Sequence, residues 1–153
     1  MIVGIGSPHG DDQLGWVAVD LLRPRLPSHV GAVKARGGLA LLEWLEGQER
    51  VIVVDAAAPS GRPGMLRSFV WPARDLEECA AGSTHGLGLV AALRLAQALG
   101  CLPPLVSIET VEAERVSPGA PLSEAVEWGV AALVESLLHR LARDADARDA
   151  GGV

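Results

Sequence analysis

The sequence is short of basic residues, cysteines and aromatic residues, and the first two shortages each exclude a class of protein. Lysine and arginine together number 13 against 19 aspartates and glutamates, and there is one phenylalanine and no tyrosine. No basic cluster is present that could neutralise a phosphate backbone, so we expect no nucleic-acid partner. The two cysteines, Cys79 and Cys101, lie far apart and form neither a CxxC motif nor a disulfide framework.

Long apolar runs are also missing. No stretch approaches the roughly 20 apolar residues that a membrane-spanning helix needs, and the N-terminus lacks the basic segment of a signal peptide. We therefore expect a cytoplasmic protein without a membrane partner. The 153 residues suffice for one domain. We expect this domain over residues 1–142, followed by a flexible tail over residues 143–153.

Aliphatic residues, in contrast, are plentiful and are arranged in short runs. The clearest run is Val51–Val54, four β-branched residues of the kind that form a buried central strand. Apolar strands alternate with amphipathic helices along the chain, which predicts an α/β fold: a three-layer α/β/α sandwich around a mostly parallel, twisted sheet of about five strands. Strands are predicted over residues 1–6, 30–36, 51–54, 65–70 and 105–111, and helices over residues 13–22, 39–45, 85–99 and 124–142, with residues 71–82 irregular.

The residues that could carry chemistry follow from this topology, because ligands of open α/β sheets bind beyond the carboxyl ends of the strands. Asp11 and Asp12 lie in the loop after the first strand, Asp55 ends the central strand, and His85 begins a helix. Two carboxylates and an imidazole suit a divalent transition metal such as nickel or zinc. The same three groups could also form an acid–base site without a metal.

Each candidate has an alternative explanation. Asp12 precedes a helix, where aspartate is a common cap, although Asp11 could take that role and leave Asp12 for the crevice. Asp55 closes an apolar strand and needs a partner beside the core. The helix dipole disfavours a protonated His85, and a neutral imidazole is the better ligand. His9 is a reserve candidate in the first loop.

A nucleotide-binding module is a further hypothesis, from the glycines of Gly4–Gly10. Their spacing is GxGxxxG, which departs from the GxGxxG of dinucleotide-binding turns. Asp11 and Asp12 would face a pyrophosphate with like charge, and Arg36 stands near the place of the expected ribose-binding acid. This hypothesis is therefore the weakest of those considered.

Four motifs, in order along nearly the whole chain, resemble those of the hydrogenase maturation endopeptidases, which trim the C-terminus of the large subunit of nickel–iron hydrogenases. The four are Gly4-x-Gly6 with Asp11-Asp12 and Gly15; Val53-Val54-Asp55-Ala56 with Pro63-Gly64 and Leu66; Ser83-Thr84-His85-x-Leu87-Gly88-Leu89; and Gly119-x-x-Leu122-Ser123. The resemblance implies a peptidase domain whose partner is the large-subunit precursor.

The resemblance also implies that Asp12, Asp55 and His85 are the catalytic and metal-contacting residues. The metal would be nickel contributed by the substrate precursor, with no organic cofactor. We expect metal-assisted or carboxylate-assisted hydrolysis with Asp12 or Asp55 as general base, since no serine or cysteine stands beside a suitable histidine–acid pair. A monomer is the simplest expectation. The alternative is a binding protein or chaperone that holds nickel-loaded precursors without cutting them.

Overall fold

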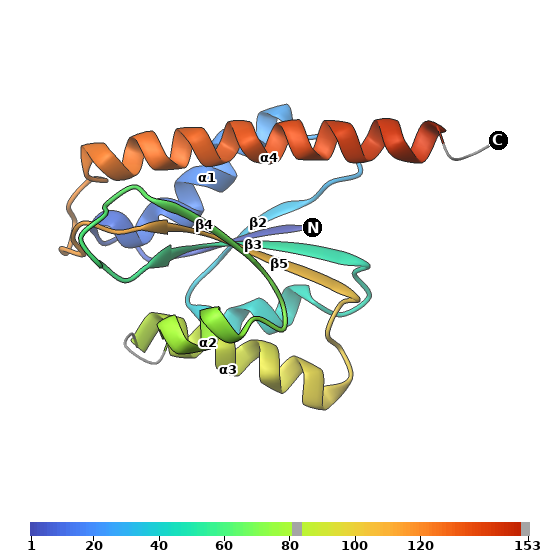
Figure 1. Cartoon of the computed structure of the whole chain (residues 1–153), viewed down its shortest axis with the longest axis horizontal. Helices are drawn as coiled ribbons and strands as arrows, with labels where there is room; N and C mark the ends of the chain where they lie inside the picture. The colour runs from blue at the N-terminus through green and yellow to red at the C-terminus, as the bar shows by residue number, and fades with distance from the viewer. Residues whose placement is uncertain (81–83, 151–153) are drawn as a thin grey trace.

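The computed structural model describes residues 1–80 and 84–150, without the side chains of residues 79–80, 84–87 and 148–150. Its centre is a five-stranded sheet in the order β2-β1-β3-β5-β4 (Figure 1). Four strands are parallel, and β4 joins the edge antiparallel to β5. The strands are β1 (Ile2–Ile5), β2 (Ala32–Ala35), β3 (Arg50–Ala57), β4 (Leu66–Val70) and β5 (Leu105–Glu112).

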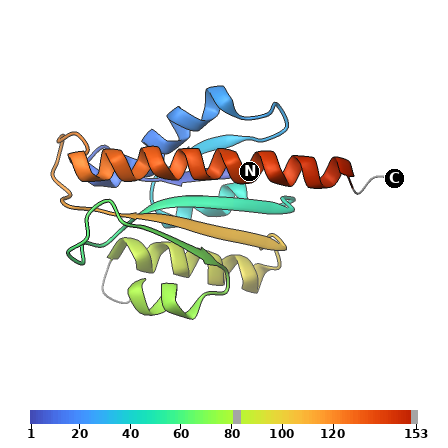
Figure 2. The same ribbon diagram turned by 45° about the horizontal axis from the view of Figure 1, so that its top comes forward.

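Helices cover both faces of the sheet, so the predicted three-layer architecture is confirmed (Figures 1 and 2). On one face lie α1 (Leu14–Leu22) and α4 (Glu124–Ala150), and on the other lie α2 (Arg74–Ala80), α3 (Thr84–Leu99) and the 3-10 helix η3 (Gly38–Trp44). Two further 3-10 turns, η1 (Gly10–Gln13) and η2 (Arg23–Arg25), flank α1. None of the helices in the described ranges is both long and apolar enough to cross a membrane.

Each face of the sheet has its own core, because successive strand residues point to opposite sides. Val3 and Val53 pack with α3 and η3, whereas Ile2, Ile52 and Val54 pack with α1 and α4. All five side chains are buried. Uninterrupted apolar runs in β1 and β3 are therefore the direct consequence of a sheet that is covered twice.

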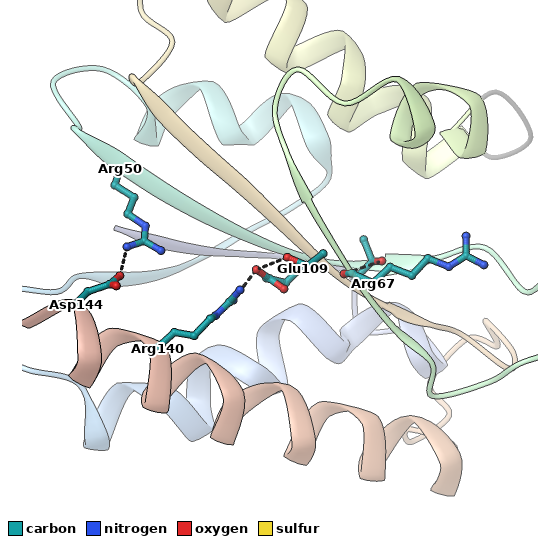
Figure 3. A network of polar contacts seen from close by, with 7 residues as sticks. Arg50, Arg67, Glu109, Arg140 and Asp144 are labelled. Carbon is teal, nitrogen blue, oxygen red and sulfur yellow. Dashed lines mark hydrogen bonds and ion pairs between the residues drawn. The ribbon is translucent and has the colours of Figure 1, made fainter. Parts of the chain in front are cut away.

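The structure departs from the sequence-based expectation in two helices. Residues 71–82 were expected to be irregular, yet α2 forms there because Leu76 is buried in the core beside Trp71. Helix α4 continues to Ala150, past the boundary predicted at residue 142. The added turns contain three alanines and two arginines, which favour helix, and an ion pair from Arg50 to Asp144 fastens them to the sheet (Figure 3).

A second ion pair holds α4 over the sheet (Figure 3). The Arg140 Nη2 donates to Oε1 of Glu109 at 2.5 Å, and the Ser68 hydroxyl donates to the same oxygen at 3.0 Å. Glu109 lies on β5 with only 3% of its surface exposed. A carboxylate so buried requires such partners, and their geometry fixes where α4 crosses β5.

Helix α1 lies unusually close to the sheet because two glycines face each other. A Cβ atom on Gly4 would lie 2.0 Å from the carbonyl oxygen of Gly15, and one on Gly15 would lie 2.1 Å from that of Ile5 and 2.7 Å from that of Val54. These obstacles are backbone atoms of packed elements and cannot move aside cheaply. The start of α1, and the loop before it, are thereby held against β1 and β3.

We expect Gly15→Ala to lower the free energy of unfolding by about 3 kcal/mol or more, because the methyl group must displace backbone. Gly88→Ala is the matched control, since its Cβ in α3 would meet nothing nearer than 3.8 Å. That variant should be neutral or more stable by about 0.5–1 kcal/mol. Urea unfolding followed by circular dichroism measures both, and equal effects would contradict the close packing of α1.

Candidate functional site

The candidate site lies where β1 and β3 end at the carboxyl edge of the sheet. Asp12 belongs to η1, directly after the β1 loop, and Asp55 lies in β3 two residues before its end. Gly6, directly after β1, lets η1 lie against the end of that strand, because a Cβ there would lie 2.4 Å from the carbonyl oxygen of Asp12. The carboxyl groups are both buried, with 2% of Asp12 and 3% of Asp55 exposed.

The electrostatics of Asp55 show that the two carboxyl groups interact. Burial raises the pKa of Asp55 to about 7 in spite of the hydrogen bond that its Oδ1 accepts from the Ala56 N–H at 2.8 Å, and the negative charge of Asp12 adds to the rise. A carboxyl group with a pKa near 7 can accept and return a proton at neutral pH. This part of the site therefore suits acid–base chemistry.

Asp11, the neighbour of Asp12, has a different surrounding. Its fully buried carboxylate accepts the backbone N–H groups of Glu114, Arg115 and Ser123 at 2.6–2.9 Å, and the Ser123 hydroxyl at 2.9 Å. Burial alone would raise the pKa of Asp11, but these hydrogen bonds outweigh it and hold the pKa below its usual value. Asp11 thus ties the loop after β5 and the start of α4 to the β1 loop.

These contacts distinguish the roles of Asp11 and Asp12. The expected capping role of Asp11 is wrong, since its carboxylate bonds to segments far along the chain, and Asp12 is the one whose charge acts on Asp55. Ser123 directly precedes the first residue of α4. Its hydroxyl donates to Asp11, and its carbonyl accepts the N–H groups of Val126 and Glu127.

The backbone places His85 at the same edge of the sheet, but its side chain lies outside the described residues. His85 is in the first turn of α3, and that end of α3 packs against Gly38, which follows the carboxyl end of β2. Ser83 also lies outside the described residues. The reserve candidate His9 is exposed to solvent. Among the side chains that the structure describes, no group of three His, Cys, Asp or Glu could hold a metal ion.

The donor chemistry of Asp12 and Asp55 nevertheless fits a cation. Two buried carboxylates that repel each other are stabilised when a divalent ion lies near both, and oxygen donors with an imidazole suit a borderline metal.

The glycines of the first loop have a different explanation from phosphate binding. Gly4 and Gly6 allow the close approaches of Gly15 and Asp12 described above.

A buried carboxylate pair at the carboxyl edge of a parallel sheet defines an α/β enzyme with acid–base or metal-assisted chemistry. Comparison with known proteins narrows this class. The model of the hydrogenase maturation protease family matches residues 36–140. The chain belongs to this family and is an endopeptidase, as the sequence resemblance predicted.

Solved structures agree with this assignment. The hydrogenase maturating endopeptidase HybD from E. coli superposes with a TM-score of 0.76 at 22% identity, over 94% of this chain and 91% of that one. The hydrogenase 2 maturation peptidase of a Thaumarchaeota archaeon gives 0.67 at 32% identity, over 92% and 95%. HybD from Thermococcus kodakarensis gives 0.70 at 24%, over 92% and 96%. No curated protein matches the chain.

We expect Asp11→Asn to lower the free energy of unfolding by about 2–3 kcal/mol at pH 7, because an amide cannot accept all of these N–H donors. A carboxylate with a lowered folded-state pKa stabilises the fold above its unfolded-state pKa, and this contribution is lost as the pH falls. The gap between parent and variant should therefore shrink below about pH 4. Urea unfolding at several pH values measures it, and a gap that is constant with pH would contradict the role of the charge.

Asp55→Asn should show the opposite pH dependence. The raised folded-state pKa means that ionising Asp55 costs stability, so the parent loses stability as the pH rises from about 4 to about 7. Relative to the parent, the variant should gain roughly 2–4 kcal/mol at pH 8 and little at pH 4. Asp20→Asn, at an exposed carboxylate paired with Lys34, is the control and should change little at either pH. If Asp55→Asn raises the free energy of unfolding at pH 8 no more than the control does, ionised Asp55 does not destabilise the fold.

Proposed function

We propose that this protein removes a short C-terminal peptide from the nickel-loaded precursor of a nickel–iron hydrogenase large subunit. The observation that carries the proposal is the buried pair of Asp12 and Asp55, with the pKa of Asp55 near 7, in a chain of the hydrogenase maturation protease family. His85 completes the proposed set of three nickel-contacting and catalytic residues.

In this proposal the nickel arrives with the substrate. Asp12 and Asp55 destabilise each other when both are ionised, so an incoming divalent cation would bind most favourably where both carboxylates reach it. A precursor without its metal offers no such compensation. The carboxylate pair would thus test whether metal insertion is complete before the peptide is cut.

Hydrolysis then needs a base and an acid, and Asp55 or Asp12 can supply both in turn. The ionised carboxylate takes a proton from a water molecule as the water oxygen adds to the scissile carbonyl carbon. The same carboxyl group then gives the proton to the departing amine as the C–N bond breaks. Nickel close to the scissile carbonyl would polarise it and assist this addition.

The setting follows from the same chemistry. We propose that the protein acts as a monomer in the cytoplasm, because a folded large subunit has to reach the carboxyl edge of the sheet. The competing function is a chaperone that binds nickel-loaded precursors without cutting them. Asp55 favours the protease, since a site for holding alone has no need of a group that exchanges protons near pH 7.

We expect Asp12→Asn, Asp55→Asn and His85→Ala each to slow trimming of a nickel-loaded precursor by at least about 100-fold, the usual scale for losing a general base. Asp20→Asn, an exposed carboxylate paired with Lys34, is the control and should trim at the parent rate. Mass spectrometry of the precursor measures the loss of its C-terminal peptide.

The same assay without nickel separates the alternatives. The parent protein should leave a nickel-free precursor uncut. If the three variants trim at the parent rate, the site assignment is wrong. If the parent protein binds the nickel-loaded precursor and never shortens it, the chaperone function replaces the protease.

A further inference from the structure

Two exposed arginines at the carboxyl edge of the sheet, Arg36 after β2 and Arg115 after β5, have no carboxylate partner among the residues that the structure describes. This is unexpected in a chain whose acidic residues outnumber its basic ones by 19 to 13. Most of the other basic side chains make ion pairs: Arg25, Lys34, Arg50, Arg74, Arg94 and Arg140.

Arg36 is held in place by an aromatic ring beside the candidate site. Its guanidinium carbon lies 5.4 Å from the centre of the Trp16 ring, within the range of a cation–π contact. The ring is itself fixed, because the Trp16 Nε1–H donates to the carbonyl of Ala35 at 2.9 Å. Trp16 follows Asp12 by about one helical turn, so the positive charge is anchored next to the Asp12 loop.

Arg115 is fixed through its backbone to the other side of that loop. Its N–H donates to the Asp11 carboxylate at 2.8 Å, and its carbonyl accepts the Asp11 N–H at 3.0 Å. In the sheet order, β1 and β3 lie between the strands that lead to Arg36 and Arg115. The carboxylate pair of Asp12 and Asp55 is therefore flanked by two cations.

An acidic site of this kind would repel a peptide that carries carboxylates near the bond to be cut. A guanidinium offsets this repulsion and matches a carboxylate with two parallel N–H donors. We propose that Arg36 and Arg115 bind carboxylates of the precursor's C-terminal extension, and so determine which extensions are accepted. The inference rests on the proposed function. Either acidic side chains or the terminal carboxylate of a short extension could supply the groups.

The test compares Arg36→Gln, Arg115→Gln and the double variant in trimming of nickel-loaded precursor. Each single change should raise KM about three- to tenfold and leave kcat within about twofold, because the arginines bind substrate without touching the reacting atoms. Arg74→Gln, whose side chain is 89% exposed on α2, is the matched control and should keep the parent KM. Added salt should raise the KM of the parent more than that of the double variant.

Substrate variants identify the source of the carboxylates. A precursor with the acidic side chains of its extension changed to amides should raise the parent KM toward that of the double variant if side chains are bound. If instead the terminal carboxylate is bound, the parent protein should still have a lower KM than the double variant with this precursor. A synthetic extension peptide with an amidated C-terminus should then bind the parent protein more weakly than the unmodified peptide. A double variant with the parent KM on the parent precursor would overturn the inference.

Failure of the proposed function would look different, since the parent protein would then cut nothing. The arginines are tested in that event by binding of the synthetic extension peptide, followed by tryptophan fluorescence, to which Trp16 contributes. Binding that weakens in the double variant and persists in Arg74→Gln supports the carboxylate site. Equal binding by the parent and the double variant contradicts it.

Discussion

The buried carboxylate of Asp11 joins three segments that are far apart in the sequence. It accepts hydrogen bonds from the loop after β5 and from Ser123 before α4, while its own backbone belongs to the loop after β1. The next residue is Asp12, so the hydrogen bonds to Asp11 also fix the position of the first carboxylate of the candidate site. At the other end of α4, the pairs of Arg140 with Glu109 and of Arg50 with Asp144 hold the helix to the sheet (Figure 3).

Asp11 and Asp55 show how the surroundings of a carboxyl group decide its role. Both are buried, but Asp11 is surrounded by N–H and O–H donors that favour its charge, whereas Asp55 accepts one N–H and faces the like charge of Asp12. The first is suited to hold structure as a permanent anion. The second is suited to exchange protons, and its ionised form would be stabilised by a nearby cation. Two buried carboxyl groups at one edge of the sheet thus have different roles, one in structure and one in chemistry.

The five strands and the sheet edge could be predicted because apolar runs and turn residues are local signals. Asp55 was also predictable, since a charge that closes an apolar run has to be accommodated. The roles of Asp11 and Asp12 could not be separated, because the partner of Asp11 is Ser123, 112 residues away. Helix α2 was missed because Leu76 is the one buried apolar residue among those of α2 whose side chains the structure describes, and one such residue gives no periodicity. The position proposed for the His85 side chain remains a prediction. The donor set allowed nickel or zinc, and the choice of nickel contributed by the substrate came from the resemblance alone.

The contact of Gly4 with Gly15 has a consequence for how such a protein can diverge. Neither position has room for any side chain, and the packed backbone around them cannot shift without moving Asp12. Mutations are therefore expected to accumulate elsewhere, for example in the exposed loops that carry Arg36 and Arg115 at the same edge of the sheet. Relatives that process different partners would be expected to share the packed glycines and the carboxylate pair. They should differ mainly in the exposed loops around this site.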